Sequence, residues 1–408
     1  IRDSVYVDKN KNGVFDQSEK PLAGIKVSDG LNVVETAADG SFTLPGHERE
    51  RFIFITTPSG YKTFNRHYHK IEKKQSGYDF GLIPYSGRIR KDGSHRYIHI
   101  TDTEIFNTEN HADWVNNVHD YARNEQAAFI IHTGDLCYEK GLKAHIKLMN
   151  TENMDCPVFY CIGNHDLVKG KYGEELFESI YGPVYYSFDA GNVHYVVTPM
   201  PGGDHAPGYT SDDVCRWLKN DLAHIRPGTP VVVFNHDLLT YEDTFIFKSK
   251  NAGSINLNEY NLKAWVYGHW HINYMKKQGD VYSVCTSSLD KGGIDHSTTA
   301  FRVMHVDSKG DFTSELRYTY LDKNICIASP AGVMASGVLP VAVNVYSSVS
   351  PVREVLYTCL ADGKPVLKNK RLLQSTDWSW NGELPLSHKY VGKELTLRVT
   401  ARFNNGEI

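Results

Sequence analysis

Five short stretches of the chain concentrate Asp, Glu, Asn and His, whose side chains bind metal ions. The densest is Gly163-Asn164-His165-Asp166, which follows an apolar run at 158–162 that is too short for a helix. The other four also follow apolar runs, and they are Asp102-Thr103-Glu104, Gly134-Asp135, Asn235-His236-Asp237 and Gly268-His269-Trp270-His271. Clusters at the carboxyl ends of strands are where α/β sheets place their sites. The set of five therefore predicts a metal-dependent site.

The elements that must position these stretches are strands and helices that alternate between residues 89 and 325. Strands are expected at 96–101, 128–133, 158–162, 193–198, 231–235, 264–267, 281–285 and 301–306, and several are apolar throughout, as strands covered on both faces must be. Helices are expected at 113–122 and 211–224, where apolar residues recur every three or four positions. This pattern predicts an α/β domain. His99, His132 and His194 lie on its strands and are interpreted as buried core histidines.

The five stretches, in this order, resemble the motifs of the calcineurin-like metallophosphoesterase superfamily, which are D-x-H, G-D, G-N-H-D/E, H and G-H-x-H. The resemblance covers the whole middle segment. One motif alone carries little information, but five in order, each after an apolar strand, are specific. The resemblance implies an α/β fold whose core is a β-sandwich flanked by helices. It also implies that residues 89–325 form the catalytic domain of a metal-dependent phosphohydrolase.

The resemblance further implies two transition-metal ions that share the carboxylate of Asp135. One ion is expected on Asp102, Asp135 and His271, and the other on Asp135, Asn164, His236 and His269. Oxygen and imidazole ligands together suit Mn, Fe or Zn. Such an ion pair activates a bridging hydroxide that attacks phosphorus. The expected substrate is a phosphate ester, and these residues do not distinguish a monoester from a diester.

His165 and Asp166 are expected to handle protons rather than metal. The resemblance leaves His165 free to donate a proton to the leaving oxygen. Asp166, its neighbour in the chain, is expected to orient the imidazole. These two residues are the predicted catalytic pair.

Glu104 departs from the family pattern, because the first motif of the family ends in histidine. Glu104 either binds a metal through oxygen, where its charge makes the bridging water less acidic, or lies behind the metals as a base. Glu104 also favours the alternative that the domain is an inactive binding or scaffold protein with a metallophosphoesterase fold. A nucleotidase is a second alternative, and it requires an aromatic clamp for the base.

Residues that contact the substrate are expected beside these motifs. Asn107 and Tyr138 follow the first and second motifs, and Trp270 lies inside the last. The Gly- and Pro-rich insertion at 200–209, with His205 and Tyr209, is expected to border the cleft, although an irregular surface loop is an equal alternative. No long basic run lies near these loops, which argues against a nucleic-acid partner.

Residues 1–88 are predicted to form a small β-sandwich of short strands at 4–7, 24–27, 31–34, 41–44 and 52–55. Within it, residues 8–19 satisfy the calcium-loop pattern D-x-[DN]-x-[DN]-G-x5-E. The expected ligands are Asp8, Asn10, Asn12, Val14, Asp16 and Glu19. The stretch resembles calcium-loop modules of bacterial extracellular proteins, but its alternative is an ordinary turn rich in Asp and Asn. Calcium would brace this loop rather than catalyse.

Residues 326–408 are predicted to form a second β-sandwich, with strands at 341–346, 353–359 and 395–400. The α/β core would thus lie between two small all-β sandwich domains, as in some bacterial surface and periplasmic proteins. We therefore expect a periplasmic, secreted or cell-surface protein whose substrate is an envelope, lipid or glycan-linked phosphate ester. Because Ile1 is not an initiator residue, a leader is expected to have been removed or left out.

Bulk composition adds few constraints. The net charge of −4 is small, and no apolar run approaches the ~20 residues that cross a bilayer, so no transmembrane segment is expected. Seven scattered cysteines show no C-x-x-C spacing, which argues against a zinc knuckle or a redox motif. We expect them to be buried as small apolar side chains, although Cys156 and Cys161 are close enough in sequence to pair. The oligomeric state is not indicated.

Overall fold

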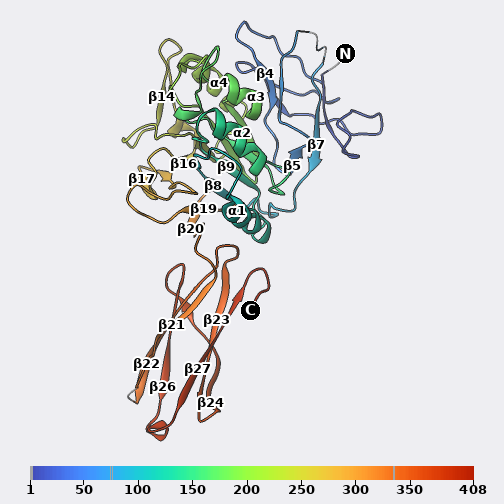
Figure 1. Ribbon diagram of the computed structural model, residues 1–408. Coiled ribbons are helices and arrows are strands. Elements are labelled where there is room, and N and C mark those ends of the chain that lie inside the picture. Colours follow the sequence, from blue (N-terminus) through green and yellow to red (C-terminus); the bar gives the residue numbers. More distant parts are fainter. Residues whose placement is uncertain (1–2, 74, 76, 334–335) are drawn as a thin grey trace.

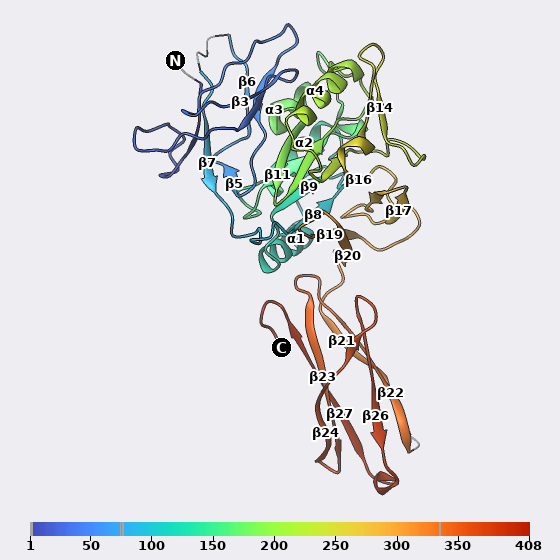
Figure 2. The same cartoon turned by 180° about the vertical axis from the view of Figure 1, so that it is seen from behind.

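The computed structural model describes residues 3–73, 75, 77–333 and 336–408. The N-terminal and middle parts pack into one body, and the C-terminal part extends from it as an elongated β domain (Figure 1). The view from behind shows the same separation (Figure 2). The sheets change between Pro84 and His95 and again between Tyr318 and Asn324, while the domain boundaries expected after residues 88 and 325 remain predictions.

The N-terminal part contains two small sheets around one apolar core. The strands are β1 (Val5–Val7), β2 (Lys26–Ser28), β3 (Val33–Glu35), β4 (Phe52–Ile55), β5 (Tyr61–Thr63), β6 (Tyr68–Lys70) and β7 (Phe80–Pro84). One sheet has the order β1-β7-β5 and the other β3-β2-β4-β6, and the core includes Val5, Val27 and Phe80. The strand expected at 41–44 is wrong, because only an isolated bridge joins Ser41 to Ser4.

The predicted calcium loop lies between β1 and β2 and is held by hydrogen bonds of its own. The carboxylate of Asp8 accepts the N–H groups of Asn12 (3.1 Å) and Gly13 (2.9 Å). The carboxylate of Glu19 accepts those of Lys9 (2.8 Å) and Asp16 (3.1 Å). These contacts suit both a calcium loop and an Asx-rich turn, so calcium binding stays a prediction.

The middle part contains two larger mixed sheets, which confirms the predicted α/β core. One sheet has the order β10-β9-β8-β19-β20, formed by β8 (His95–Ile100), β9 (Phe129–His132), β10 (Val158–Tyr160), β19 (Ala300–Val306) and β20 (Phe312–Tyr318). The other has the order β11-β12-β13-β16-β18-β17, formed by β11 (Tyr186–Ala190), β12 (Val193–Val197), β13 (Val231–Phe234), β16 (Leu262–Tyr267), β17 (Tyr274–Gln278) and β18 (Val281–Cys285). A short hairpin, β14 (Ile246–Lys248) and β15 (Ser254–Asn256), lies outside both sheets. Every strand expected in this segment is present.

Helices cover the outer faces of these sheets. They are α1 (Ala112–Asn124), α2 (Tyr138–Leu148), α3 (Glu175–Tyr181) and α4 (Ser211–Ala223), and the two that were expected lie at α1 and α4. Tyr97 and Phe129 of one sheet pack in the same core as Phe234 of the other, so the sheets face each other. Apolar residues of α1, α2 and α3, such as Trp114, share a second core with Ile100 on the opposite face of β8. This is a sandwich flanked by helices.

The C-terminal domain is a sandwich of two antiparallel sheets. Its strands are β21 (Asn324–Ser329), β22 (Gly337–Tyr346), β23 (Val352–Ala361), β24 (Lys364–Arg371), β25 (Leu373–Gln374), β26 (Ser379–Leu386) and β27 (Leu395–Phe403). The sheet orders are β21-β22-β26-β25 and β24-β23-β27, with Val343, Tyr357 and Trp380 in the shared core. The strands predicted in this domain are confirmed.

Two further findings concern the whole chain. All seven cysteines are free thiols, and all except Cys326 are buried, so the pairing of Cys156 with Cys161 does not occur. Among the described residues, no helix combines the length and the apolar character needed to cross a membrane.

The three strand histidines are buried and have hydrogen-bond partners, as expected. His99 bonds to Thr133 and Thr286, and His132 to Thr103 and the N–H of Gly134. His194 lies between the carboxylates of Asp189 (2.6 Å) and Asp221 (2.7 Å). Burial lowers the pKa of His194, but the two carboxylates outweigh it and raise the value to about 9.

Candidate metal centre

The loops that follow β8, β9, β10, β13 and β16 meet at one edge of the two sheets. The N–H of Asp102 donates to the carbonyl of Gly134 (3.0 Å), which joins the first loop to the second. The N–H of His165 donates to Asp135 Oδ1 (3.0 Å), and the N–H of Gly268 donates to the carbonyl of His236 (3.0 Å). The structure therefore brings the five predicted stretches together.

Close approach between these loops explains two of the glycines in the motifs. A Cβ at Gly163 would lie 2.2 Å from Asp135 Oδ1. A Cβ at Gly268 would lie 1.9 Å from Thr101 Oγ1 and 2.4 Å from Asp102 Oδ2. All three distances are shorter than van der Waals contact, and the backbone N of Asp135 would lie only 2.3 Å from the Cβ at Gly163, so a larger residue at either position would push the loops apart.

Five candidate ligands have left-handed backbone conformations, which non-glycine residues seldom adopt. They are Asp102, Glu104, Asp135, His269 and His271, with φ between 47° and 65°. Such conformations cost about 1–3 kcal/mol each and occur mainly at functional sites. The fold therefore keeps these five residues in an unfavourable backbone conformation, and their side chains gather in the same region.

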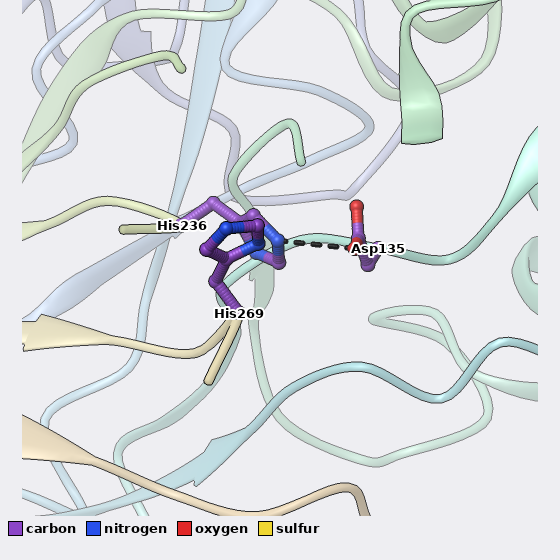
Figure 3. A group of neighbouring side chains, drawn as sticks. All are labelled: Asp135, His236 and His269. Atoms are coloured by element: carbon purple, nitrogen blue, oxygen red, sulfur yellow. Dashed lines mark ion pairs between the residues drawn. The ribbon is translucent and has the colours of Figure 1, made fainter. Parts of the chain in front are cut away.

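The candidate ligands form two neighbouring groups. Figure 3 shows the first, in which the imidazoles of His236 and His269 lie side by side and Asp135 faces His236. The second group contains Asp102, Glu104 and His271, and in each group the ligand atoms lie within 4.8 Å of one another. Asp135 also groups with Glu104 and Cys137, so its carboxylate lies between the two sets. This position suits the bridging role predicted for Asp135.

Three buried atoms in these loops have no hydrogen-bond partner: Asp102 Oδ1, Asn164 Oδ1 and His236 Nε2. Buried polar atoms in proteins nearly always have a partner, and each of these three belongs to a predicted metal ligand. Asp102 Oδ1 lies 3.1 Å from His271 Nε2 and 3.9 Å from His236 Nε2, so it faces both groups. Metal ions would satisfy these atoms.

The electrostatics of the centre also favour bound cations. Burial lowers the pKa of His236, but the charges of Asp135 and Asp102 outweigh it and raise the value to about 10. Close contacts with the carboxylates of Asp102 (3.1 Å) and Glu104 (3.3 Å) raise the pKa of His271 to about 10. A site that attracts protons this strongly also attracts metal ions, so the residues fit the predicted metal pair.

His165 lies beside the ligands and pairs with a residue that the sequence did not indicate. Its Nδ1 is 2.8 Å from Asp204 Oδ2, and its ring centre is 5.3 Å from that of Tyr138. Partial burial lowers the pKa of His165, but the bond to Asp204 and the charge of Asp135 raise it overall. Asp204 comes from the 200–209 insertion, whose polar residues were the available signal. The N–H of Asp204 donates to the carbonyl of Asn164 (3.1 Å), so this insertion borders the site as expected.

Asp166 does not have the partner expected for it. Its Oδ2 accepts the N–H groups of Asp135 (2.9 Å) and Gly163 (2.8 Å), and its Oδ1 accepts that of Cys137 (2.9 Å). Because both oxygens are bonded to buried backbone groups, the carboxylate is not available to orient His165. Asp166 instead ties the loop after β10 to the loop after β9.

Glu104 lies among the ligands rather than behind them. Its Oε1 is 3.3 Å from His271 Nε2, and its Oε2 is 2.7 Å from the Nζ of Lys291, another residue that the sequence did not indicate. Burial raises the pKa of the Glu104 carboxyl, but the bonds to His271 and Lys291 lower it overall. Glu104 is therefore placed as an ionised ligand.

The predicted substrate residues differ in how they lie. Tyr138 is exposed beside His165, whereas the indole of Trp270 donates to Asp237 Oδ1 (3.0 Å) and stacks on Tyr241. Asn107 and His205 are exposed, and Asn107 Oδ1 accepts the N–H of Glu109. The prediction that Tyr209 contacts the substrate is wrong. Its side chain is buried in the core, and its hydroxyl donates to the carbonyl of Met200.

Comparisons with known proteins agree with this geometry. Residues 95–273 match the family model for calcineurin-like phosphoesterase, and residues 9–84 match the model for the N terminal of calcineurin-like phosphoesterase. Purple acid phosphatase 13 of Arabidopsis thaliana is 26% identical over 215 residues, which cover 49% of this chain and 36% of that protein. The chain thus spans little more than a third of the length of that curated relative.

Solved structures of low similarity also match. A putative 5'-nucleotidase from Staphylococcus aureus is 13% identical with a TM-score of 0.35, and the match covers 56% of this chain and 54% of that chain. An archaeal phosphodiesterase is 13% identical with a TM-score of 0.28, and the match covers 54% of this chain and 99% of that chain. TM-scores of this size carry no functional argument.

Proposed function

The chain belongs to the calcineurin-like phosphoesterase family, a family of metal-dependent phosphohydrolases, and we propose that it hydrolyses phosphate esters with two transition-metal ions. The observation that carries this proposal is the set of three buried ligand atoms without partners, on Asp102, Asn164 and His236. They lie in loops that many other hydrogen bonds hold together, so poor packing does not explain them. Each such atom costs about 1–3 kcal/mol, and these three belong to candidate ligands in adjoining loops, where bound ions would satisfy them.

The ions, when bound, supply an activated water as nucleophile and withdraw charge from the phosphoryl oxygens. The chain's own residues place them and handle the leaving group. Asp135 lies between the two ligand groups, held by the N–H bond from His165 to its Oδ1. As the P–O bond to the leaving group breaks, His165 donates a proton to the leaving oxygen. The proton comes from Nε2, because Nδ1 is paired with Asp204.

The substrate class is the less constrained part of the proposal. We favour a phosphate mono- or diester in the cell envelope, linked to a lipid or a glycan. The support is the arrangement of two β domains around the catalytic core, which is an argument from architecture. The same argument supports a periplasmic, secreted or cell-surface location. Fractionation of cells that express the full-length gene tests the location, and recovery in the cytoplasm would contradict it.

A metal analysis combined with a substrate panel tests the proposed activity. The protein is loaded with Mn²⁺, Fe²⁺ or Zn²⁺ and assayed with p-nitrophenyl phosphate, bis(p-nitrophenyl) phosphate and adenosine monophosphate. We expect two metal equivalents per chain and turnover of at least one aryl ester. Failure to bind metal and to hydrolyse any of the three would support the scaffold alternative. Strong preference for the nucleotide would instead support a nucleotidase.

A further inference from the structure

Lys291 contacts the one ligand position that departs from the family motif. Its Nζ lies 2.7 Å from Glu104 Oε2, while Glu104 Oε1 lies 3.3 Å from His271 Nε2. One carboxylate therefore contacts a lysine with one oxygen and a candidate metal ligand with the other. The Glu104 side chain is 20% exposed and the Lys291 side chain 42%, so water screens this pair in part.

The loop that carries Lys291 is tied to the loop that carries Asp102 and Glu104. The buried hydroxyl of Ser288 donates to the carbonyl of Asp102 (2.7 Å) and accepts the N–H of Lys291 (3.1 Å). The ammonium group also lies 5.5 Å from the centre of the Phe106 ring. Backbone, hydroxyl and ring contacts together hold the lysine beside Glu104.

The role of the Glu104–Lys291 pair follows from the net charge of the centre. With a neutral histidine at the position of Glu104, as in the family motif, the centre would carry the two negative charges of Asp102 and Asp135. Glu104 adds a third, and the ammonium group of Lys291 cancels it. The Glu104–Lys291 pair therefore has the same net charge as the single histidine of the family motif.

We propose that Lys291 is the counter-charge that balances Glu104, so that the centre keeps the net charge that it has with the histidine of the family motif. The inference rests on the proposed function, because it concerns the same metal pair. Lys291 acts through Glu104, so it is a positioning residue and needs no contact with the substrate.

A double-mutant cycle on metal binding tests the proposal. E104H leaves the charge of Lys291 uncompensated, and we expect metal affinity to fall on the order of 10- to 100-fold, the effect of one unit charge on a nearby divalent ion. K291M leaves the negative charge of Glu104 uncompensated, so metal affinity should rise, and an affinity unchanged from wild type would count against the proposal. In E104H/K291M the charges balance again, and affinity should return to within a few-fold of wild type. E104Q, which keeps the shape of glutamate, repeats the test if the histidine does not pack.

Lys323 offers a closely matched control. Its Nζ is 2.7 Å from Glu407, its side chain is 44% exposed against 42% for Lys291, and it lies 5.2 Å from the Phe403 ring centre. The two lysines match in exposure and in distance to their carboxylates, whereas Glu407 is more exposed than Glu104 (47% against 20%), and the control pair belongs to none of the candidate metal groups. K323M should leave metal affinity unchanged in every background.

Affinity is measured by competition with a fluorescent chelator for Zn²⁺ or Mn²⁺, without substrate. The direction of each change therefore tests Lys291, whereas the substrate panel tests the proposed function. Weaker metal binding by K291M would overturn the proposal, because it would mean that Lys291 only stabilises the folded structure of the site. Additive losses in the double variant would overturn it as well.

Discussion

Replacement of Asp204 by asparagine is a direct test of how the site controls its proton donor. Asp204 is the carboxylate partner of His165 at 2.8 Å, but both side chains are about one-third exposed (34% and 36%). Water therefore screens the pair, and its contribution falls in the range of about 0.5–1 kcal/mol. D204N should lower the pKa of His165, because the hydrogen bond and the charge of Asp204 both raise it, and should lower the rate by about 2- to 5-fold.

The assay is the pH dependence of kcat with two substrates, one with an alkyl and one with a p-nitrophenyl leaving group. Because Asp204 raises the pKa of His165, its removal should shift the alkaline limb of the profile to lower pH for the alkyl substrate. The p-nitrophenyl substrate, which needs little protonation, should change less. In an H165A background D204N should have no further effect, and an additive loss there would refute the coupling.

Other expected outcomes concern metal, acid catalysis, stability and calcium. D135N should remove both metals, by elemental analysis, and nearly all activity. H165A should keep the metals but cut kcat ~10²–10⁴-fold, least for leaving groups that need no proton. The pKa of His194 is raised from 6.5 to about 9, so its protonated form stabilises the fold fully below pH 6.5. In urea titrations the free energy of unfolding should fall by about 3 kcal/mol as pH rises through 9. H194N should not show this decrease. Calcium should raise the thermal midpoint of the chain, and D8N/E19Q should abolish the increase.

The strands and ligands of the core could be predicted because each depends on short stretches of sequence. Runs rich in apolar residues and β formers marked β8, β9, β10, β13 and β16, and polar residues just after them are the candidate ligands. The N-terminal strands β5, β6 and β7 were missed, because Lys, His, Gly and Pro interrupt their short sequences and leave few β formers. The strand expected at 41–44 failed because its apolar residues pack in the core without a partner strand.

The residues that tune the site could not be predicted because their partners are remote in sequence. Asp204 is 39 positions from His165, and Lys291 is 187 positions from Glu104. No local pattern links such pairs, and their contact depends on how the loops fold over the sheet edge. Asp166 was misassigned for the opposite reason: it is next to His165 in sequence, yet its side chain points to the backbone of Gly163, Asp135 and Cys137.

Hydrogen bonds within the protein fix the orientation of two of the candidate ligands. Asp102 Oδ2 accepts the hydroxyl of Thr101 and the N–H of His269, which leaves Oδ1 free. His236 Nδ1 donates to the carbonyl of Thr133 (2.7 Å), which leaves Nε2 as the atom that faces the ligands. Asp102 and His236 thus each have one atom fixed by the protein and one atom without a partner. Because the hydrogen bonds that join the loops do not pass through the ions, removal of the metals should cost stability without loss of the fold.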